Sequence, residues 1–217
     1  MSLSRLTFDK KNTATTFIDG EAGEIEVLIT LPDELTESTP IAVISHPHPL
    51  YGGTMTNKVV HILAKSFSEL NAITVRFNFR GVGKSEGKYD EGIGEARDLQ
   101  VLVSKLKQWR PNAPIWLAGF SFGAYVTARA HKAIQPEKLL LVAPPVSMYP
   151  FDDLDEIKVP WFVIQGGQDE VIDANAVKDW VNKCSEQPQL IWMEEASHFF
   201  HGKLIEIKDS LLKAWST

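Results

Sequence analysis

A serine flanked by glycines is the feature of this sequence most suited to chemistry. The run Gly119–Gly123 reads Gly-Phe-Ser-Phe-Gly, follows an apolar segment at 115–118 and opens a helical pattern. Side chains two positions before and after Ser121 would collide with the backbone of so tight a turn, so glycine fits both places and the serine Oγ projects above a sheet. The start of a helix beneath it favours developing negative charge. The pattern predicts a nucleophilic Ser121, against the alternative of a glycine-rich turn with a helix-capping serine.

Two further residues are placed to activate that serine. A hydroxyl is a weak nucleophile at neutral pH, so it needs a base and a group that orients the base. Asp169 follows the apolar run 161–165, and His198 follows the last apolar run, 190–193. We therefore predict that His198 is the base and that Asp169 orients it. His201 is the alternative base, but it lies further along the chain from the end of the strand.

Three other reactive side chains fit structural roles better. Asp173 directly precedes a helical pattern, so we expect it to cap that helix rather than to act as the acid. Glu170 is expected to point away from the site if Asp169 points into it. Cys184 is the only cysteine, and its place at the end of a helical pattern predicts a half-buried thiol. A single cysteine also excludes an intrachain disulfide framework and a multi-cysteine zinc site.

The negative charge of an acyl-transfer intermediate needs two backbone N–H donors. One is expected from Phe122, the residue after the nucleophile, and the other from the loop that follows the apolar run 41–45. The two prolines of this loop have no N–H, which leaves His48 as the leading donor and Leu50 as the second choice. His46 and His48 lack a third clustered ligand in the sequence, so we expect no metal site.

These residues must be positioned by short apolar runs that alternate with helical patterns. The alternation predicts parallel β-α-β units, with helices on both faces of a mostly parallel sheet of about seven or eight strands. The active site of such a sheet lies at the carboxyl ends of its strands, where all the candidate residues fall. The expected strands are 24–30, 41–45, 72–78, 114–119, 138–143, 159–165 and 189–193, and the expected helices are 57–70, 95–109, 122–133, 173–183 and 204–215.

Composition limits the class of protein. Hydrophobic residues make up 44% and charged residues 23% of the 217 residues, which is typical of a globular chain, and we expect one domain over residues 1–217. The net charge is −6 and no long basic run occurs, which argues against nucleic acid or an anionic membrane surface as the partner. No segment approaches the roughly 20 apolar residues that span a bilayer, and the first residues lack the apolar run of a signal peptide. We expect a soluble, cytoplasmic protein.

Taken together, these motifs resemble the α/β-hydrolase superfamily over nearly the whole chain, from residue 41 to the closing helix. The likeness lies in the runs 44–53, 79–87, 119–123 and 166–169 and in His198, with the nucleophile, acid and base in the order Ser, Asp, His. The chain is most similar to small bacterial hydrolases of the esterase-like or dienelactone-hydrolase-like kind. The resemblance implies an α/β-hydrolase fold and makes the run 79–85 a structural turn beneath the site, without a catalytic role.

Two departures from that family bear on function. Many relatives carry a helical lid between the strand after the elbow helix and the strand that bears the acid, but here only residues 144–158 lie between them. We therefore expect no cap domain and an open, shallow site. Dienelactone hydrolases use cysteine as the nucleophile, whereas this chain has Ser121.

The expected function is a serine hydrolase without cofactor that cleaves small or moderate carboxylic esters through an acyl-enzyme. Ser121 attacks the carbonyl, His198 moves the proton and Asp169 orients the imidazole. Aromatic and sulfur side chains near these motifs are candidates for a substrate pocket, with ordinary core packing as the alternative. The candidate pocket residues are Tyr51, Phe120, Met148 and Phe199.

Three alternatives remain. The same triad could cleave amides, thioesters or peptides or act as an acyltransferase, and the chain could also be a non-catalytic binding module on a hydrolase scaffold. A nucleotide-binding switch is suggested by Lys84 and Ser85, which look like the end of a phosphate-binding loop. That motif requires glycine where this chain has Asn78, so we expect no nucleotide.

Overall fold

The computed structural model describes residues 3, 6–154 and 156–215. Strands and helices alternate along most of this length, and most expected elements occur within a few residues of their expected bounds. Within the described part of the chain, no helix is both long and apolar enough to cross a membrane. The strands are β1 Thr13–Asp19, β2 Glu24–Thr30, β3 Ile41–Ser45, β4 Ile73–Phe77, β5 Ile115–Phe120, β6 Lys138–Val142, β7 Trp161–Gly166 and β8 Gln189–Met193, and the helices are α1 Lys58–Glu69, α2 Ile93–Trp109, α3 Phe122–Ile134, α4 Ala174–Lys183 and α5 Leu204–Trp215.

One sheet of eight strands forms the centre, in the order β1-β2-β4-β3-β5-β6-β7-β8. The strands from β4 to β8 in this order pair in parallel, while β2 pairs antiparallel with both β1 and β4. The expected α/β fold with a mostly parallel sheet is confirmed. The first strand, β1, was not expected, although its alternating pattern and the Gly20–Gly23 turn to β2 are typical of a hairpin.

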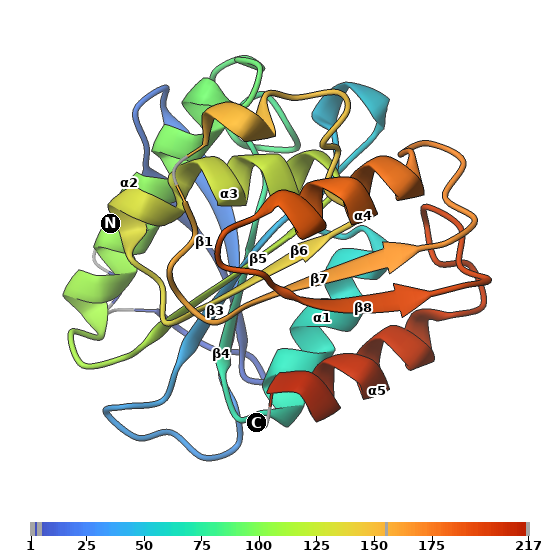
Figure 1. Ribbon diagram of the computed structural model, residues 1–217. Coiled ribbons are helices and arrows are strands. Elements are labelled where there is room, and N and C mark those ends of the chain that lie inside the picture. Colours follow the sequence, from blue (N-terminus) through green and yellow to red (C-terminus); the bar gives the residue numbers. More distant parts are fainter. Residues whose placement is uncertain (1–2, 4–5, 155, 216–217) are drawn as a thin grey trace.

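Helices cover both faces of the sheet. Figure 1 shows α1 and α5 packed together on one face, with α2, α3 and α4 on the other. Each face has its own apolar core, and β3 and β5 between them are buried along their whole length. This explains why their sequences are continuous apolar runs rather than alternating ones.

The connection between β6 and β7 is short. Its described residues form only a 3-10 helix, Phe151–Asp153, so this part of the chain carries no helical cap. The segment instead runs along the carboxyl edge of the sheet, where Met148 and Tyr149 line a cavity. The expectation of a fold without a lid is confirmed.

The turn after β4 is a structural support. Arg80 forms two hydrogen bonds with the Asp98 carboxylate, at 2.7 and 2.9 Å, and both side chains are almost fully buried. The Ser85 hydroxyl donates to the Asn78 carbonyl at 2.7 Å. The Lys84 N–H donates to a carboxylate oxygen of Glu26 at 2.9 Å, so an N–H that a phosphate-binding loop would offer to its anion already has an acidic partner.

Candidate active site

Ser121 occupies a strained turn between β5 and α3. Its backbone has φ 54° and ψ −121°, a conformation that side chains rarely adopt. A Cβ atom at Gly119 would collide with the carbonyl oxygen of Gly123, and one at Gly123 would collide with the carbonyl oxygens of Ser45 and His46. Glycine is therefore required at both positions, for the steric reason that the sequence suggested.

The loops after β7 and β8 bring the other two candidates to this serine. His198 Nε2 lies 3.1 Å from Ser121 Oγ, and His198 Nδ1 lies 2.9 Å from Asp169 Oδ2. The side chains of His198 and Asp169 are 3% and 0% exposed, so water does not compete for the bond between them. The three side chains form one hydrogen-bonded chain at the carboxyl edge of the sheet.

The Asp169 carboxylate is held by its own loop. Its Oδ1 accepts the N–H groups of Val171 and Ile172, at 2.9 and 2.7 Å. Burial by itself raises the pKa of Asp169, but the hydrogen bonds from His198 and from these N–H groups outweigh burial and lower the pKa below its ordinary value. The carboxylate therefore stays ionised at neutral pH, with Oδ2 directed at the imidazole.

Glu170 anchors the loop that carries His198, contrary to the expectation from the sequence. Glu170 does not point away from the site: its Oε2 accepts the backbone N–H of His198 at 3.0 Å. The Phe120 ring packs against the imidazole at 5.2 Å between centroids. His201, the alternative base, is exposed. Asp173 caps α4 as expected, because its Oδ1 accepts the N–H groups of Asn175 and Ala176.

Two residues whose backbone N–H has no acceptor among the described residues, His48 and Phe122, line the same cavity as Ser121. Phe122 is the first residue of α3, where an N–H has no partner inside the helix. The His48 N–H donates to no acceptor among the described residues. The Leu50 N–H, by contrast, donates to His48 Nδ1 at 3.2 Å. Leu50 is therefore a poor second choice, because its donor is already engaged.

The His48 side chain also fixes the loop that carries its N–H. Because Nδ1 accepts from Leu50, the proton of the neutral ring sits on Nε2, which lies 3.3 Å from the Tyr89 hydroxyl. Burial lowers the pKa of His48 and so favours this neutral form. The Tyr89 ring in turn lies 5.7 Å from the Phe122 ring, and the Phe122 ring lies 5.6 Å from that of Tyr149, between centroids. The sequence analysis missed this network, since its members come from three separate loops.

The cavity above these groups has a volume of about 840 Å³. Ser121, His198, His48 and Phe122 all line it. This volume lies towards the upper end of the range for pockets that bury a drug-sized ligand, so the site is roomier than the shallow one expected from the missing lid.

Three of the four candidate pocket residues line this cavity. They are Tyr51, Met148 and Phe199. Phe120 does not: it is fully buried on β5 and packs beneath the cavity, between His198 and Phe200. The prediction for Phe120 was wrong because this last residue of β5 turns its ring into the core that α1 and α5 cover, whereas Phe122 lines the cavity.

Other reactive groups do not assemble a second site. Among residues 3, 6–154 and 156–215, no group of three or more His, Cys, Asp or Glu side chains could hold a metal ion. Cys184 is half-buried, with its Sγ 3.3 Å from the Trp180 carbonyl oxygen. Burial raises its pKa, so the thiolate that nucleophilic chemistry needs is disfavoured.

Comparison with known proteins places this chain in a family. The family model described as "Alpha/beta hydrolase domain" matches residues 50–207. The chain is 36% identical over 205 residues to the uncharacterized protein RP471 of Rickettsia prowazekii (strain Madrid E), covering 90% of this chain and 85% of that protein.

Two solved structures are similar over nearly their full length. One is XC6422 from Xanthomonas campestris, described as a member of the a/b serine hydrolases without a lid, with 41% identity, a TM-score of 0.89 and coverage of 96% of this chain and 95% of that one. The other is an alpha-beta serine hydrolase homologue from Coxiella burnetii, with 45% identity, a TM-score of 0.89 and coverage of 95% and 99%.

Proposed function

Because this chain belongs to the alpha/beta hydrolase superfamily, we propose that it is a serine hydrolase with Ser121 as nucleophile, His198 as general base and Asp169 as the acid that orients it. The observation that carries the proposal is the continuous hydrogen-bonded chain from Ser121 Oγ through both nitrogens of His198 to Asp169. An activated serine requires a base within hydrogen-bonding distance of its hydroxyl and a third group that hydrogen-bonds the base and orients it.

The geometry supports a two-step acyl transfer. In the neutral imidazole that donates Nδ1–H to Asp169, Nε2 is the free base and takes the Ser121 proton as Oγ attacks the substrate carbonyl. The imidazolium, stabilised by the Asp169 carboxylate, then gives that proton to the leaving oxygen, and an acyl-enzyme remains on Ser121. In the second step His198 takes a proton from water, the hydroxide attacks the acyl carbonyl, and the proton returns to Ser121 as the acid leaves.

The N–H groups of Phe122 and His48 are proposed to hold the oxyanion of both tetrahedral intermediates. Both residues line the cavity with Ser121, and each N–H lacks a protein acceptor among the described residues. Removing one donor of this kind typically costs about 10²–10³ in turnover. The proline residues on either side of His48 stiffen the loop, so its donor is held in place before substrate arrives.

Carboxylic esters are the proposed substrates. An alkoxide leaves from the tetrahedral intermediate more readily than an amide nitrogen, so esters place a smaller demand on the general acid than amides do. The cavity adjoins the serine directly, without cap helices among the described residues of the β6–β7 segment, and so admits a free small molecule.

A fluorophosphonate probe tests the activated serine. We expect covalent labelling of the purified chain, with the adduct mapped to Ser121 and hydrolysis of a para-nitrophenyl ester lost in step with labelling. Ser121→Ala should abolish both, whereas Ser38→Ala, at an exposed serine, should change neither. A folded wild-type chain that resists the probe would point to a non-catalytic binding protein on this scaffold. The hydrolysis rates of matched ester, amide and thioester substrates then show which bond the protein cleaves fastest.

A further inference from the structure

Exposed apolar side chains gather around the mouth of the cavity. Eight large hydrophobic side chains in the described part of the chain are substantially exposed, and five of them line this one cavity. A sixth, Leu50, is in the same 3-10 helix as Tyr51. Single exposed apolar residues are ordinary, but a contiguous group marks a binding surface. The five residues, called the apolar rim below, are Tyr51, Ile93, Met148, Val171 and Phe199.

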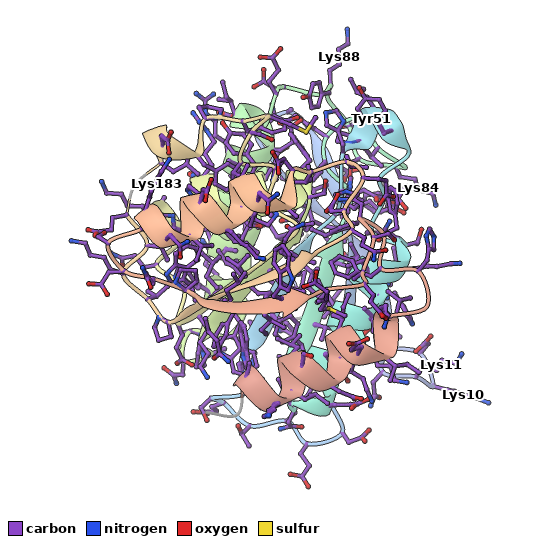
Figure 2. The ribbon with its side chains drawn as sticks, turned by 45° about the vertical axis from the view of Figure 1, so that its right-hand side comes forward. Lys10, Lys11, Tyr51, Lys84, Lys88 and Lys183 are labelled. Carbon is purple, nitrogen blue, oxygen red and sulfur yellow. The ribbon has the colours of Figure 1, made fainter. Side chains whose placement is uncertain are left out.

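The apolar rim is assembled from separate segments. Tyr51 follows β3, Ile93 begins α2 and Met148 lies between β6 and β7, while Val171 and Phe199 follow β7 and β8. Tyr51 is 86% and Met148 61% exposed, and Figure 2 shows Tyr51 on the outer surface of the molecule. Local packing accounts for only part of the rim: Phe199 packs on Phe120 and His198, and Tyr51 packs on His48. The Met148 side chain is mostly exposed, so it could be polar with little loss of buried contact.

Charge around the cavity does not select an ionic ligand. The only charged side chains in its described lining are Glu91 and Arg129, one of each sign. Arg129 donates to the Tyr125 hydroxyl at 3.1 Å. A lining with balanced charges and an apolar opening favours a neutral, nonpolar group.

The positions of the reacting groups decide which part of an ester meets this rim. The leaving oxygen must face His198, which donates its proton, so the alcohol lies on the side of Phe199, whose ring contacts the imidazole at 5.0 Å. The acyl group then faces the opposite wall. There the Tyr149 ring packs on Phe122, 5.6 Å between centroids, and Met148 precedes it in the chain.

We propose that the substrate is a neutral ester with an extended nonpolar acyl chain, which fills the cavity and lies across the apolar rim at Met148 and Tyr51. This inference rests on the proposed serine hydrolase function and names its substrate class. The rim is continuous with the cavity that holds Ser121, so a chain attached to the serine reaches it without leaving protein contact. A cavity of about 840 Å³ is far larger than an acetyl ester fills.

Hydrolysis of a para-nitrophenyl ester series by the purified full chain tests this proposal. Each methylene that becomes buried raises kcat/KM by up to about fourfold. We expect kcat/KM to rise at least about tenfold from acetate to octanoate, both kept below aggregating concentrations. Met148→Ser should lower the octanoate-to-acetate ratio by about fivefold, and Met148→Leu should restore it. Ile205→Ser, which replaces an exposed apolar residue outside the cavity, should leave the ratio unchanged.

The outcomes separate failure of this inference from failure of the proposed function. A flat chain-length profile with acetate hydrolysis and fluorophosphonate labelling of Ser121 intact would overturn the substrate class alone. Loss of labelling in the folded wild-type chain would instead overturn the serine hydrolase. A dimer that Met148→Ser dissociates, together with a flat profile, would show that the rim is covered by a second copy, and would also overturn the inference.

Discussion

His46 should make the fold sensitive to mild acid. Its ring is fully buried beneath the loop that carries His48. Nε2 accepts the Phe79 N–H at 3.0 Å, so the ring proton is on Nδ1, which donates to the Pro47 carbonyl at 2.6 Å. A second proton on Nε2 would face the Phe79 N–H and would be placed in an apolar interior. Burial therefore lowers the pKa of His46 from 6.5 to about 4, although the bond to Pro47 acts in the opposite direction.

The linkage between protonation of His46 and folding gives the sign and size of the change in unfolding free energy with pH. Between pH 6.5 and 4 the unfolded chain binds a proton at this histidine and the folded chain does not, so stability falls as pH falls. The loss of unfolding free energy due to His46 is about 2 kcal/mol at pH 5 and about 3 kcal/mol at pH 4, relative to neutral pH. Well above pH 6.5 the unfolded chain no longer binds this proton, so His46 contributes no slope there.

The comparison with His46→Gln isolates this contribution. Glutamine can still accept the Phe79 N–H but does not titrate, so the variant loses some stability at all pH values and lacks the acid slope. Urea unfolding from pH 7 to pH 4 should show the wild-type advantage over His46→Gln shrinking by about 3 kcal/mol. A difference that stays constant across this range would refute the reasoning, because it would mean that folding leaves the pKa of His46 unchanged.

Three further substitutions probe the site. Asp169→Asn should lower kcat on the order of 10⁴-fold, because the amide favours the wrong imidazole tautomer, while Asp173→Asn, at a helix cap, should leave ester hydrolysis unaltered. Tyr89→Phe removes the partner of His48 Nε2 and should lower kcat by about fivefold in steady-state assays; an unchanged kcat would show that this bond does not hold the loop. Gly119→Ala forces a Cβ into the backbone of the elbow, and the unfolding free energy measured in urea should fall by about 3 kcal/mol.

The sequence predicted well those parts of the fold that depend on local signals. The bounds of β8 and α5 agree with expectation, and α1 and α4 begin after the predicted caps, Asn57 and Asp173. Continuous apolar runs and side-chain caps are properties of a few neighbouring residues, so they can be seen without a structure. The strand β1 was not predicted because its Thr-rich run is only partly apolar and its burial comes from pairing with β2.

The direction of individual side chains and the contacts between loops could not be predicted from local signals in the sequence. Phe120 was expected in the cavity, but the strand end turns its ring into the core. Glu170 was expected to point away, and it binds the backbone of His198 instead. The contact between His48 and Tyr89 joins positions 41 residues apart. Each of these depends on where two loops meet in space, which spacing along one chain does not specify.

The described β6–β7 segment carries no cap helix, yet the proposed triad is well ordered, because hydrogen bonds that involve a backbone group hold each of its members. The Ser121 N–H donates to the Val142 carbonyl at 2.8 Å. Asp169 accepts two N–H groups of its own loop, and the His198 N–H donates to Glu170. None of these bonds uses a side chain of the apolar rim. In the proposed mechanism the sheet edge therefore holds the reacting groups, and the apolar rim selects the acyl chain independently of them.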